Sequence, residues 1–211
     1  MKTLAAGLSI MLVTLFLSVL YFWGSSAAEE NPYTLQAGDI VFQGNAGRQA
    51  DAIREATDSP FTHCGIVFLQ DNQWLVLEAV QPVRVTALEG FLARSAPGSF
   101  HARRLKSAPT QEAIDHAWKW GSNLTGRNYD SQFRWDDDKL YCSELVWKVF
   151  QHVGIELCPR RHFRDYHLDR PAVQKIIKSR YGSVDKLPAD EWVVAPGDLA
   201  ASPLLTEVPK R

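Results

Sequence analysis

The sequence predicts an α+β fold in which an antiparallel sheet packs against a helix that begins at a cysteine. Residues 65–80 form two apolar runs separated by four polar residues, 70–73, which predicts a β-hairpin. From Cys142 onward, apolar side chains recur at helical spacing until Gly154, which predicts an amphipathic helix. At 211 residues, the chain is long enough for one domain with a buried core.

The remaining elements follow from the same kinds of pattern. The expected elements are a strand over 38–43, helices over 48–56 and 88–94, a strand over 100–105, a helix over 111–120 and a helix over 172–180. Thr110 is the expected cap of the fifth of these, and Gly121 its expected end. Arg103 and Arg104 are expected at an edge of the sheet because a basic pair suits a solvated strand.

Composition excludes several classes of protein. Hydrophobic residues make up 45% and charged residues 22% of the chain, which is typical of a globular domain rather than a disordered one. The formal net charge is −1, so no nucleic-acid partner is expected.

The N-terminal segment has the pattern of a targeting sequence. Lys2 precedes an uncharged, largely apolar run over residues 4–23, and small residues lead to Ala28. Residues 1–28 are therefore expected to be a cleaved signal peptide or a retained membrane anchor, and the two alternatives stay open. Both place the domain over 29–211, with its C-terminal extension from about 159, outside the cytoplasm in the periplasm or on a membrane.

Three cysteines, Cys64, Cys142 and Cys158, form an odd set. In an exported protein this predicts a free thiol and at most one disulfide, for which Cys64 and Cys158 are the candidates. The cysteines and histidines lack the spacing of a zinc site, so neither a metal nor another cofactor is expected.

Cys142 and His63 are the candidate catalytic pair. A cysteine at a helix N-terminus gains thiolate character from the unpaired N–H groups there, and a protonated histidine adds to it. His63 opens an apolar strand and is expected to act as base towards Cys142 and as acid towards the leaving group. The alternatives are a core cysteine and a histidine that hydrogen-bonds a backbone carbonyl.

Glu78 is the candidate third member of the site. A carboxylate inside an apolar run is costly unless it has a partner, and the hairpin returns it towards His63. Its alternative is a solvated glutamate on a sheet edge. Tyr141 and Gln43 are candidates for oxyanion or substrate contacts beside the Cys142 N–H, and Glu144 is expected to cap the helix.

Five segments in this order resemble the YiiX-like proteins, a circularly permuted branch of the papain-like NlpC/P60 hydrolases. The segments are 38–43, 62–66, 77–83, 128–130 and 141–147. The histidine precedes the cysteine here, whereas in papain-like enzymes it follows. The resemblance implies a permuted papain-like fold and a Cys142, His63 and Glu78 triad in an exported bacterial protein. Cys64 departs from the pattern, which has a small or aliphatic residue after the histidine.

The sequence thus predicts a cysteine hydrolase that cleaves amide or ester bonds in the cell envelope through a covalent acyl-enzyme. The expected substrate is a cell-wall peptide or a lipid or acyl compound. Three alternatives remain: a non-catalytic envelope ligand-binding or scaffold domain, a lipid acyltransferase or thioesterase, and a metal-dependent hydrolase. Neither the acyl acceptor nor the oligomeric state follows from the sequence.

Overall fold

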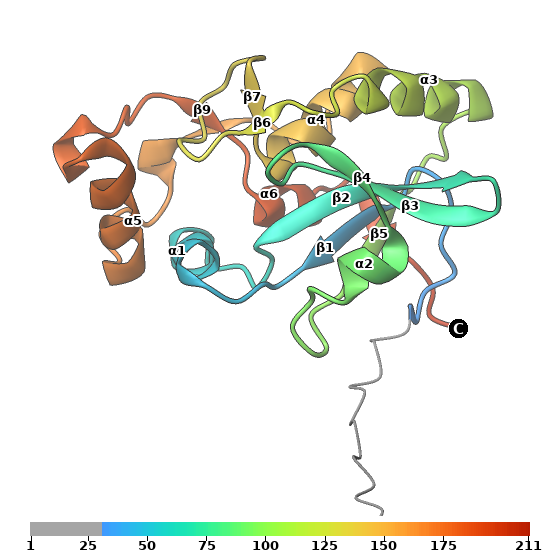
Figure 1. Ribbon diagram of the computed structural model, residues 1–211, viewed down its shortest axis with the longest axis horizontal. Helices are drawn as coiled ribbons and strands as arrows, with labels where there is room; N and C mark the ends of the chain where they lie inside the picture. Colours follow the sequence, from blue (N-terminus) through green and yellow to red (C-terminus); the bar gives the residue numbers. More distant parts are fainter. Residues whose placement is uncertain (1–30) are drawn as a thin grey trace, which may run out of the picture.

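A six-stranded antiparallel sheet forms the centre of the computed structural model, which describes residues 31–211 (Figure 1). The strand order is β10-β5-β1-β2-β3-β4. The strands are β1 (Ile40–Gln43), β2 (His63–Gln70), β3 (Gln73–Glu78), β4 (Arg84–Ala87), β5 (His101–Leu105) and β10 (Leu205–Glu207). Two short pairs lie outside this sheet: β6 (Asn128–Tyr129) with β7 (Lys139–Leu140), and β8 (Arg161–His162) with β9 (Trp192–Val193).

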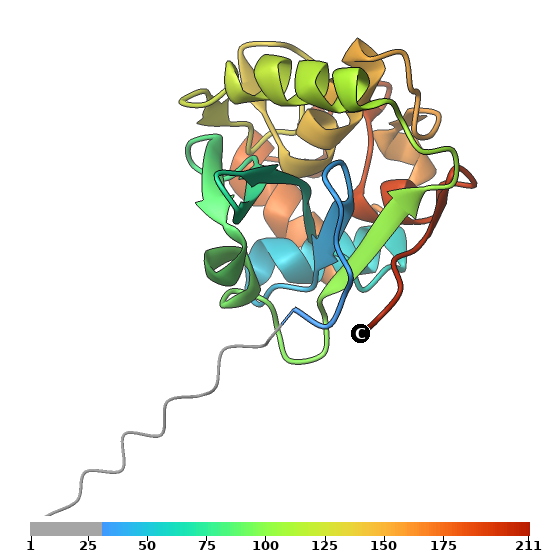
Figure 2. The same cartoon turned by 90° about the vertical axis from the view of Figure 1, so that its right-hand side faces the viewer.

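Helices cover the sheet on both faces (Figure 2). Helix α4 (Cys142–His152) packs on β2, with α3 (Gln111–Ser122) beside it, and α2 (Leu88–Leu92) contacts β3 and β4. The side chains of β2 therefore alternate between two cores, with Ile66 in the core below α4 and Val67 in the core on the α2 side. Burial on both faces explains why β1 and β2 read as unbroken apolar runs.

The predicted β-hairpin is confirmed, but its turn is shorter than expected. The register pairs Gln70 with Gln73, so only Asp71 and Asn72 form the loop. Both have positive φ, 47° and 60°, the conformation of a tight two-residue hairpin turn in which aspartate and asparagine are favoured. The turn leaves Glu78 on the same face as Val76.

The expected position of Arg103 and Arg104 at a sheet edge is wrong. β10 pairs antiparallel with β5 and places it inside the sheet. Arg104 instead forms a bidentate pair with buried Asp39, at 2.7 and 2.8 Å. Three C-terminal residues complete the sheet, and their pattern is too short to read as a strand in the sequence.

Most of the expected helices are confirmed, including α1 (Arg48–Thr57) and α5 (Pro171–Tyr181). Thr110 caps α3 through Ala113 N as predicted. Gly121 does not end α3 but lies inside it, where an added Cβ would come 2.5 Å from Leu77 Cδ2. The short helical segments are η1 (Phe163–Asp165), η2 (Val184–Lys186) and α6 (Pro196–Ala200).

The segment from about residue 159 packs onto the rest of the chain. Helix α5 lies against α1, although more than a hundred residues separate them in sequence (Figure 1). The predicted signal or anchor segment, residues 1–28, lies outside the described residues. Within residues 31–211, none of the helices combines the length and hydropathy needed to cross a bilayer.

Candidate active site

Cys142 is the first residue of α4 and is 3% exposed. Its backbone N–H, like the others of a first helical turn, has no partner within the helix. Glu144 in the same turn accepts a hydrogen bond from Tyr141 N at 3.3 Å, so the capping role expected for Glu144 is confirmed. The Cys142 thiol thus lies at the N-terminus of α4, the end of a helix that favours a negative charge.

His63 lies between Cys142 and Glu78. Its Nε2 is 2.6 Å from Glu78 Oε2, and its ring stacks on Phe91 with centroids 5.5 Å apart. The Cys142 side chain also lies beside the imidazole, where hydrogen bonding to it raises the pKa of His63. Because Nε2 faces Glu78, Nδ1 is the nitrogen that faces the sulfur. The structure therefore brings together the three residues that the sequence singles out.

Glu78 is completely buried and has a partner on each oxygen. Its Oε1 accepts from Thr86 Oγ1 at 2.6 Å and from Arg94 Nη2 at 2.5 Å, and its Oε2 faces His63. The alternative of a solvated edge glutamate is therefore wrong. Three donors around one carboxylate hold it ionised and fix its orientation towards the imidazole.

The pKa values of these groups shift in the directions that favour an ion pair. Burial alone would lower the pKa of His63, but hydrogen bonds to Cys142 and Glu78 raise it to about 9. Burial opposes ionisation of Glu78, yet the bond to His63 brings its pKa down to about 2. The pKa of the Cys142 thiol falls well below its usual range. At neutral pH the site is a thiolate beside an imidazolium.

Cys64 is the largest single cause of the low pKa of Cys142. Hydrogen bonding from its thiol and from its backbone N–H favours the Cys142 thiolate and so lowers the pKa of Cys142. The pKa of Cys64 itself is raised well above its usual range by burial, so it stays a neutral donor. All three cysteines are free thiols, and the disulfide considered between Cys64 and Cys158 is not formed.

Tyr141 and Gln43 lie near the pair, and the Tyr141 hydroxyl and the Gln43 amide oxygen have hydrogen-bond partners elsewhere. Tyr141 is buried, and its hydroxyl accepts a hydrogen bond from Val194 N at 3.2 Å. Gln43 pairs with His63 across β1 and β2, and its Oε1 accepts from Ser95 Oγ at 2.6 Å. The Nε2 of Gln43 is buried and has no hydrogen-bond partner among the described residues.

Three residues of the site were not identified as functional from the sequence. Thr86 and Arg94 hold Glu78, but a threonine in a strand and an arginine after a short helix carry no signal of that role. Tyr129 lines the same cavity as His63, and its hydroxyl accepts a hydrogen bond from Gln49 Nε2 at 2.9 Å. The sign of its role in the sequence was its position in the 128–130 segment, one of the five that resemble the YiiX-like proteins.

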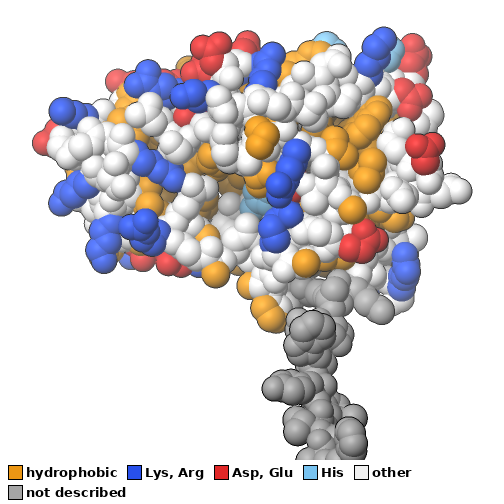
Figure 3. Space-filling model, viewed as in Figure 1, with side chains coloured by type: hydrophobic (Ala, Val, Ile, Leu, Met, Phe, Trp, Pro, Cys, Tyr) orange, Lys and Arg blue, Asp and Glu red, His pale blue; other side chains and the backbone are white. Residues whose placement is uncertain are grey.

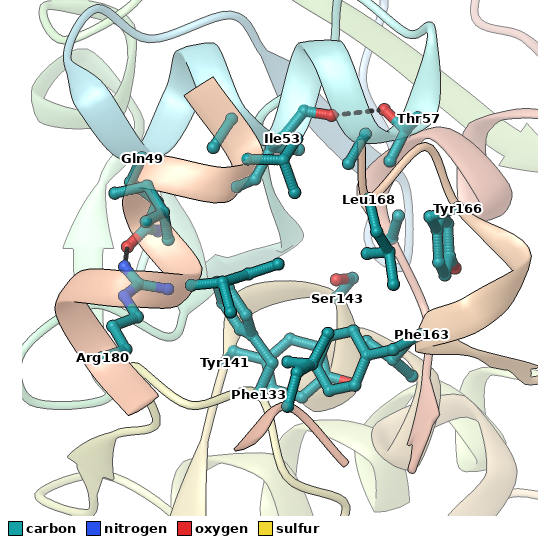
Figure 4. A pocket seen from close by; sticks show the side chains of 18 of the residues that line it. Gln49, Ile53, Thr57, Phe133, Tyr141, Ser143, Phe163, Tyr166, Leu168 and Arg180 are labelled. Carbon is teal, nitrogen blue, oxygen red and sulfur yellow. Dashed lines mark hydrogen bonds between the residues drawn. The ribbon is translucent and has the colours of Figure 1, made fainter. Parts of the chain in front are cut away.

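Two cavities adjoin the candidate catalytic residues. The first, here called the apolar pocket, includes Cys142 in its wall and lies between α1 and α5 (Figure 4). The second, the polar cavity, includes His63, Asn45, Thr62 and Gln81. Figure 3 shows this side of the molecule hollowed near its centre, with histidine and apolar side chains exposed there. Gln49 belongs to both walls, so the two cavities adjoin.

The sequence of the chain is similar to those of known proteins. The profile of a family described as permuted papain-like amidase enzyme, YaeF/YiiX, C92 family, matches residues 34–209. The chain is 35% identical over 176 residues to the uncharacterized protein YiiX of Escherichia coli strain K12, covering 83% of this chain and 86% of that protein.

A solved structure matches the fold over the same share of the chain. It is the crystal structure of the metalloprotein YiiX from Escherichia coli O157:H7, with a TM-score of 0.79 and 35% identity. The match covers 83% of this chain and 97% of that one. The predicted permuted papain-like fold is confirmed, and the chain belongs to the YaeF/YiiX family of permuted papain-like amidases, the C92 family.

Proposed function

We propose that this protein is a cysteine hydrolase that cleaves amide or ester bonds of cell-envelope compounds through an acyl-enzyme on Cys142. One observation carries the proposal: His63 contacts the Cys142 sulfur on one side and Glu78 at 2.6 Å on the other. A buried histidine held between a carboxylate and a helix-terminal thiol is the arrangement that activates a nucleophile. Membership of an amidase family supports the same class of reaction.

In the first half of the reaction, the Cys142 thiolate adds to the substrate carbonyl carbon and forms a C–S bond. The backbone N–H of Cys142 is the donor that can stabilise the oxyanion. The bond from the carbonyl carbon to the leaving oxygen or nitrogen then breaks, and the His63 imidazolium gives that atom its proton. An acyl-enzyme and a neutral His63 remain.

In the second half, the neutral imidazole takes a proton from water as the water oxygen adds to the acyl carbon. The C–S bond breaks, the carboxylic acid leaves, and the thiolate and imidazolium return. Glu78 keeps the imidazole in one orientation and stabilises its positive charge in both halves. Each turnover consumes one water and releases one acid and one alcohol or amine.

The envelope location rests on the sequence. Lys2 and the apolar run over residues 4–23 support export, followed by either cleavage near Ala28 or retention as an anchor. N-terminal sequencing of the mature protein from fractionated cells separates the two alternatives, and recovery of the chain in the cytoplasmic fraction would contradict both.

Alkylation by iodoacetamide at neutral pH tests the nucleophile. Cys142 is expected to react quickly, whereas the burial that raises the pKa of Cys158 to about 12 leaves it slow. Cys142→Ala removes the fast reaction, and Cys158→Ala serves as the matched control that keeps it. Mass spectrometry of the wild-type protein after incubation with envelope extract should find an acyl adduct on Cys142.

The second candidate is a non-catalytic envelope binding domain. It predicts a folded protein whose three thiols react slowly and equally. The three partners of the Glu78 carboxylate argue against it. A domain that only binds a ligand would not need a buried carboxylate that orients a histidine.

A metal-dependent hydrolase is the third candidate, because the YiiX protein of the solved crystal structure is described as a metalloprotein. Within residues 31–211, no three side chains of histidine, cysteine, aspartate or glutamate gather in a metal-binding arrangement. His63 instead hydrogen-bonds Glu78 and interacts with Cys142. The donor set does not fit a metal, and a chelator is expected to leave the activity intact.

A further inference from the structure

We propose that Cys64 is a resolving cysteine: when a peroxide oxidises Cys142, Cys64 forms a reversible disulfide with it, and the hydrolase stays inactive until that bond is reduced. This inference rests on the proposed function only for the activity that is lost. The disulfide itself can be detected without turnover, so the two can fail separately.

Cys64 and Cys142 come from different elements and lie beside each other. Cys64 is the second residue of β2, directly after His63, and Cys142 is the first residue of α4, which packs on β2 (Figure 1). Both side chains belong to the core below α4, where Cys64 is completely buried and Cys142 is 3% exposed. The Cys64 thiol is close enough to the Cys142 sulfur to favour its thiolate. Both are free thiols, so a pair that can be oxidised lies at the candidate nucleophile.

The surroundings of the two thiols give them different roles. The thiolate is the form of cysteine that reacts with a peroxide, and Cys142 holds it at neutral pH because its pKa lies well below the usual range. Cys142 also lies in the wall of the apolar pocket, which is partly open to solvent and admits a molecule as small as hydrogen peroxide. Cys64 belongs to neither cavity wall, and burial raises the pKa of its thiol, which therefore stays neutral. Cys142 is thus oxidised first.

Oxidation of Cys142 removes a charge that keeps Cys64 protonated. The negative Cys142 sulfur contributes to raising the pKa of Cys64. A neutral sulfenic acid at Cys142 carries no such charge, so the pKa of Cys64 falls and its thiolate becomes easier to form. The order of events, with Cys142 first and Cys64 second, follows from this coupling.

The disulfide forms in two steps. In the first, the Cys142 thiolate takes a hydroxyl group from the peroxide: the S–O bond forms, the O–O bond breaks, and the other oxygen leaves as water or an alcohol with the proton of the His63 imidazolium. The sulfur is oxidised and the peroxide reduced. In the second, the Cys64 sulfur attacks the Cys142 sulfur, the S–S bond forms as the S–O bond breaks, and the hydroxyl group leaves as water with the Cys64 proton. A dithiol later reduces this disulfide by exchange and is itself oxidised to a disulfide.

The disulfide protects the Cys142 sulfur as well as blocking it. Without a neighbouring thiol, a sulfenic acid is oxidised further to sulfinic and sulfonic acids, which a dithiol does not reverse. The extracytoplasmic location proposed above is an oxidising environment, where a reactive thiolate meets such oxidants. Cys64 therefore turns a permanent loss of Cys142 into a reversible one.

The test treats the wild type, Cys64→Ser and Cys158→Ser with hydrogen peroxide at neutral pH and maps their peptides by mass spectrometry without reduction. The wild type is expected to yield a peptide pair linked through Cys64 and Cys142, and to lose the fast iodoacetamide alkylation of Cys142 until dithiothreitol restores it. Cys64→Ser cannot form the link, so its Cys142 should be oxidised to the sulfinic or sulfonic acid and stay unreactive after dithiothreitol. Cys158→Ser is the matched control, because it removes another buried thiol of the same core, and it should behave like the wild type.

The serine hydroxyl is close in size to the thiol and keeps a hydrogen-bond donor at residue 64. Fast alkylation of Cys142 before peroxide therefore shows that the site of Cys64→Ser is intact, and the peptide map of the wild type decides the inference even if this variant does not fold. Irreversible oxidation of the wild type, or a link through Cys158, in protein whose Cys142 alkylates fast before peroxide, overturns the inference and leaves the hydrolase standing. A link between Cys64 and Cys142 in protein that hydrolyses no ester or amide would overturn the hydrolase alone.

Discussion

Cys64 lies beside Cys142, and both its thiol and its backbone N–H favour the Cys142 thiolate, so that they lower the pKa of Cys142. The residue after the histidine thus favours ionisation of Cys142, the candidate nucleophile. Only the contribution of the thiol depends on the side chain of Cys64. Mutation can therefore separate it from the contribution of the backbone N–H to the pKa of Cys142.

Cys64→Ala is expected to raise the pKa of Cys142 while leaving a reactive thiolate. The backbone N–H of residue 64 and the His63 imidazolium remain, and only the thiol donor is lost. The measurement is the rate of iodoacetamide alkylation of Cys142 against pH, whose midpoint should move to higher pH. Cys158→Ala removes a buried thiol elsewhere and should leave the midpoint in place. An unchanged midpoint in Cys64→Ala would show that the contact is mere packing.

Glu78→Gln is expected to lower kcat/KM for p-nitrophenyl acetate by roughly 10²- to 10⁴-fold, the usual range for disabling an acid–base pair. The amide keeps the shape but removes the charge that helps to raise the pKa of His63 to about 9. In the wild type, kcat/KM should fall as pH rises through about 9, where the imidazolium is lost. This fall is the alkaline limb of the pH profile, and in the variant it should move to lower pH.

Glu89→Gln is the matched control for that experiment, because Glu89 is an exposed residue on the neighbouring helix α2. It should keep both the rate and the alkaline limb. Full activity in Glu78→Gln would contradict the role assigned to the carboxylate.

The candidate catalytic residues could be picked out in the sequence because each stands out from its local pattern. Cys142 opens an apolar helix, His63 opens an apolar strand, and Glu78 places a charge in an apolar run. Within a hairpin, the chain itself brings the last two together, so local reasoning was enough. The helix contributes its free N–H groups by its geometry alone.

The rest of the site depends on contacts between distant segments, which no local pattern reports. The apolar pocket exists because α5 packs against α1, where Ala172 N donates to Glu55 Oε2 at 2.8 Å. Arg94 reaches Glu78 from beyond α2, and β10 joins the sheet from the C-terminus. Each element is predictable by itself, but its partner is not.

Gly65→Ala is expected to reduce both stability and activity. A Cβ at residue 65 would come 2.5 Å from Val76 Cγ1 and 3.4 Å from Glu78 Cβ, so strand β3 must shift beside the catalytic carboxylate. Overpacking of this kind costs about 1–3 kcal/mol. The measurements are urea unfolding and kcat/KM of the folded protein for p-nitrophenyl acetate.

Gly121→Ala gives the comparison for Gly65→Ala. Its Cβ would come 2.5 Å from Leu77 Cδ2 and 3.1 Å from Val149 Cγ2, in the core below α4. It should lower stability by a similar amount and keep the alkaline limb of the pH profile near pH 9. If both variants lose stability alike and neither moves that limb, Gly65 has no special relation to the Glu78 and His63 pair.

Acid is expected to destabilise the fold through Glu78. Its pKa of about 2 in the folded protein lies below the ordinary value of 4.5, so its contribution is present above about pH 4.5 and is lost as pH falls towards 2. The difference corresponds to about 3 kcal/mol. His63 has the opposite sign: its pKa of about 9 stabilises the fold fully below pH 6.5, and this contribution is lost as pH rises to 9. Urea unfolding between pH 7 and 2.5 measures the Glu78 contribution. The free energy of unfolding should fall with pH less steeply in Glu78→Gln than in the wild type, and as steeply as in the wild type in Glu89→Gln. Parallel declines in all three proteins would mean that other carboxylates govern acid unfolding.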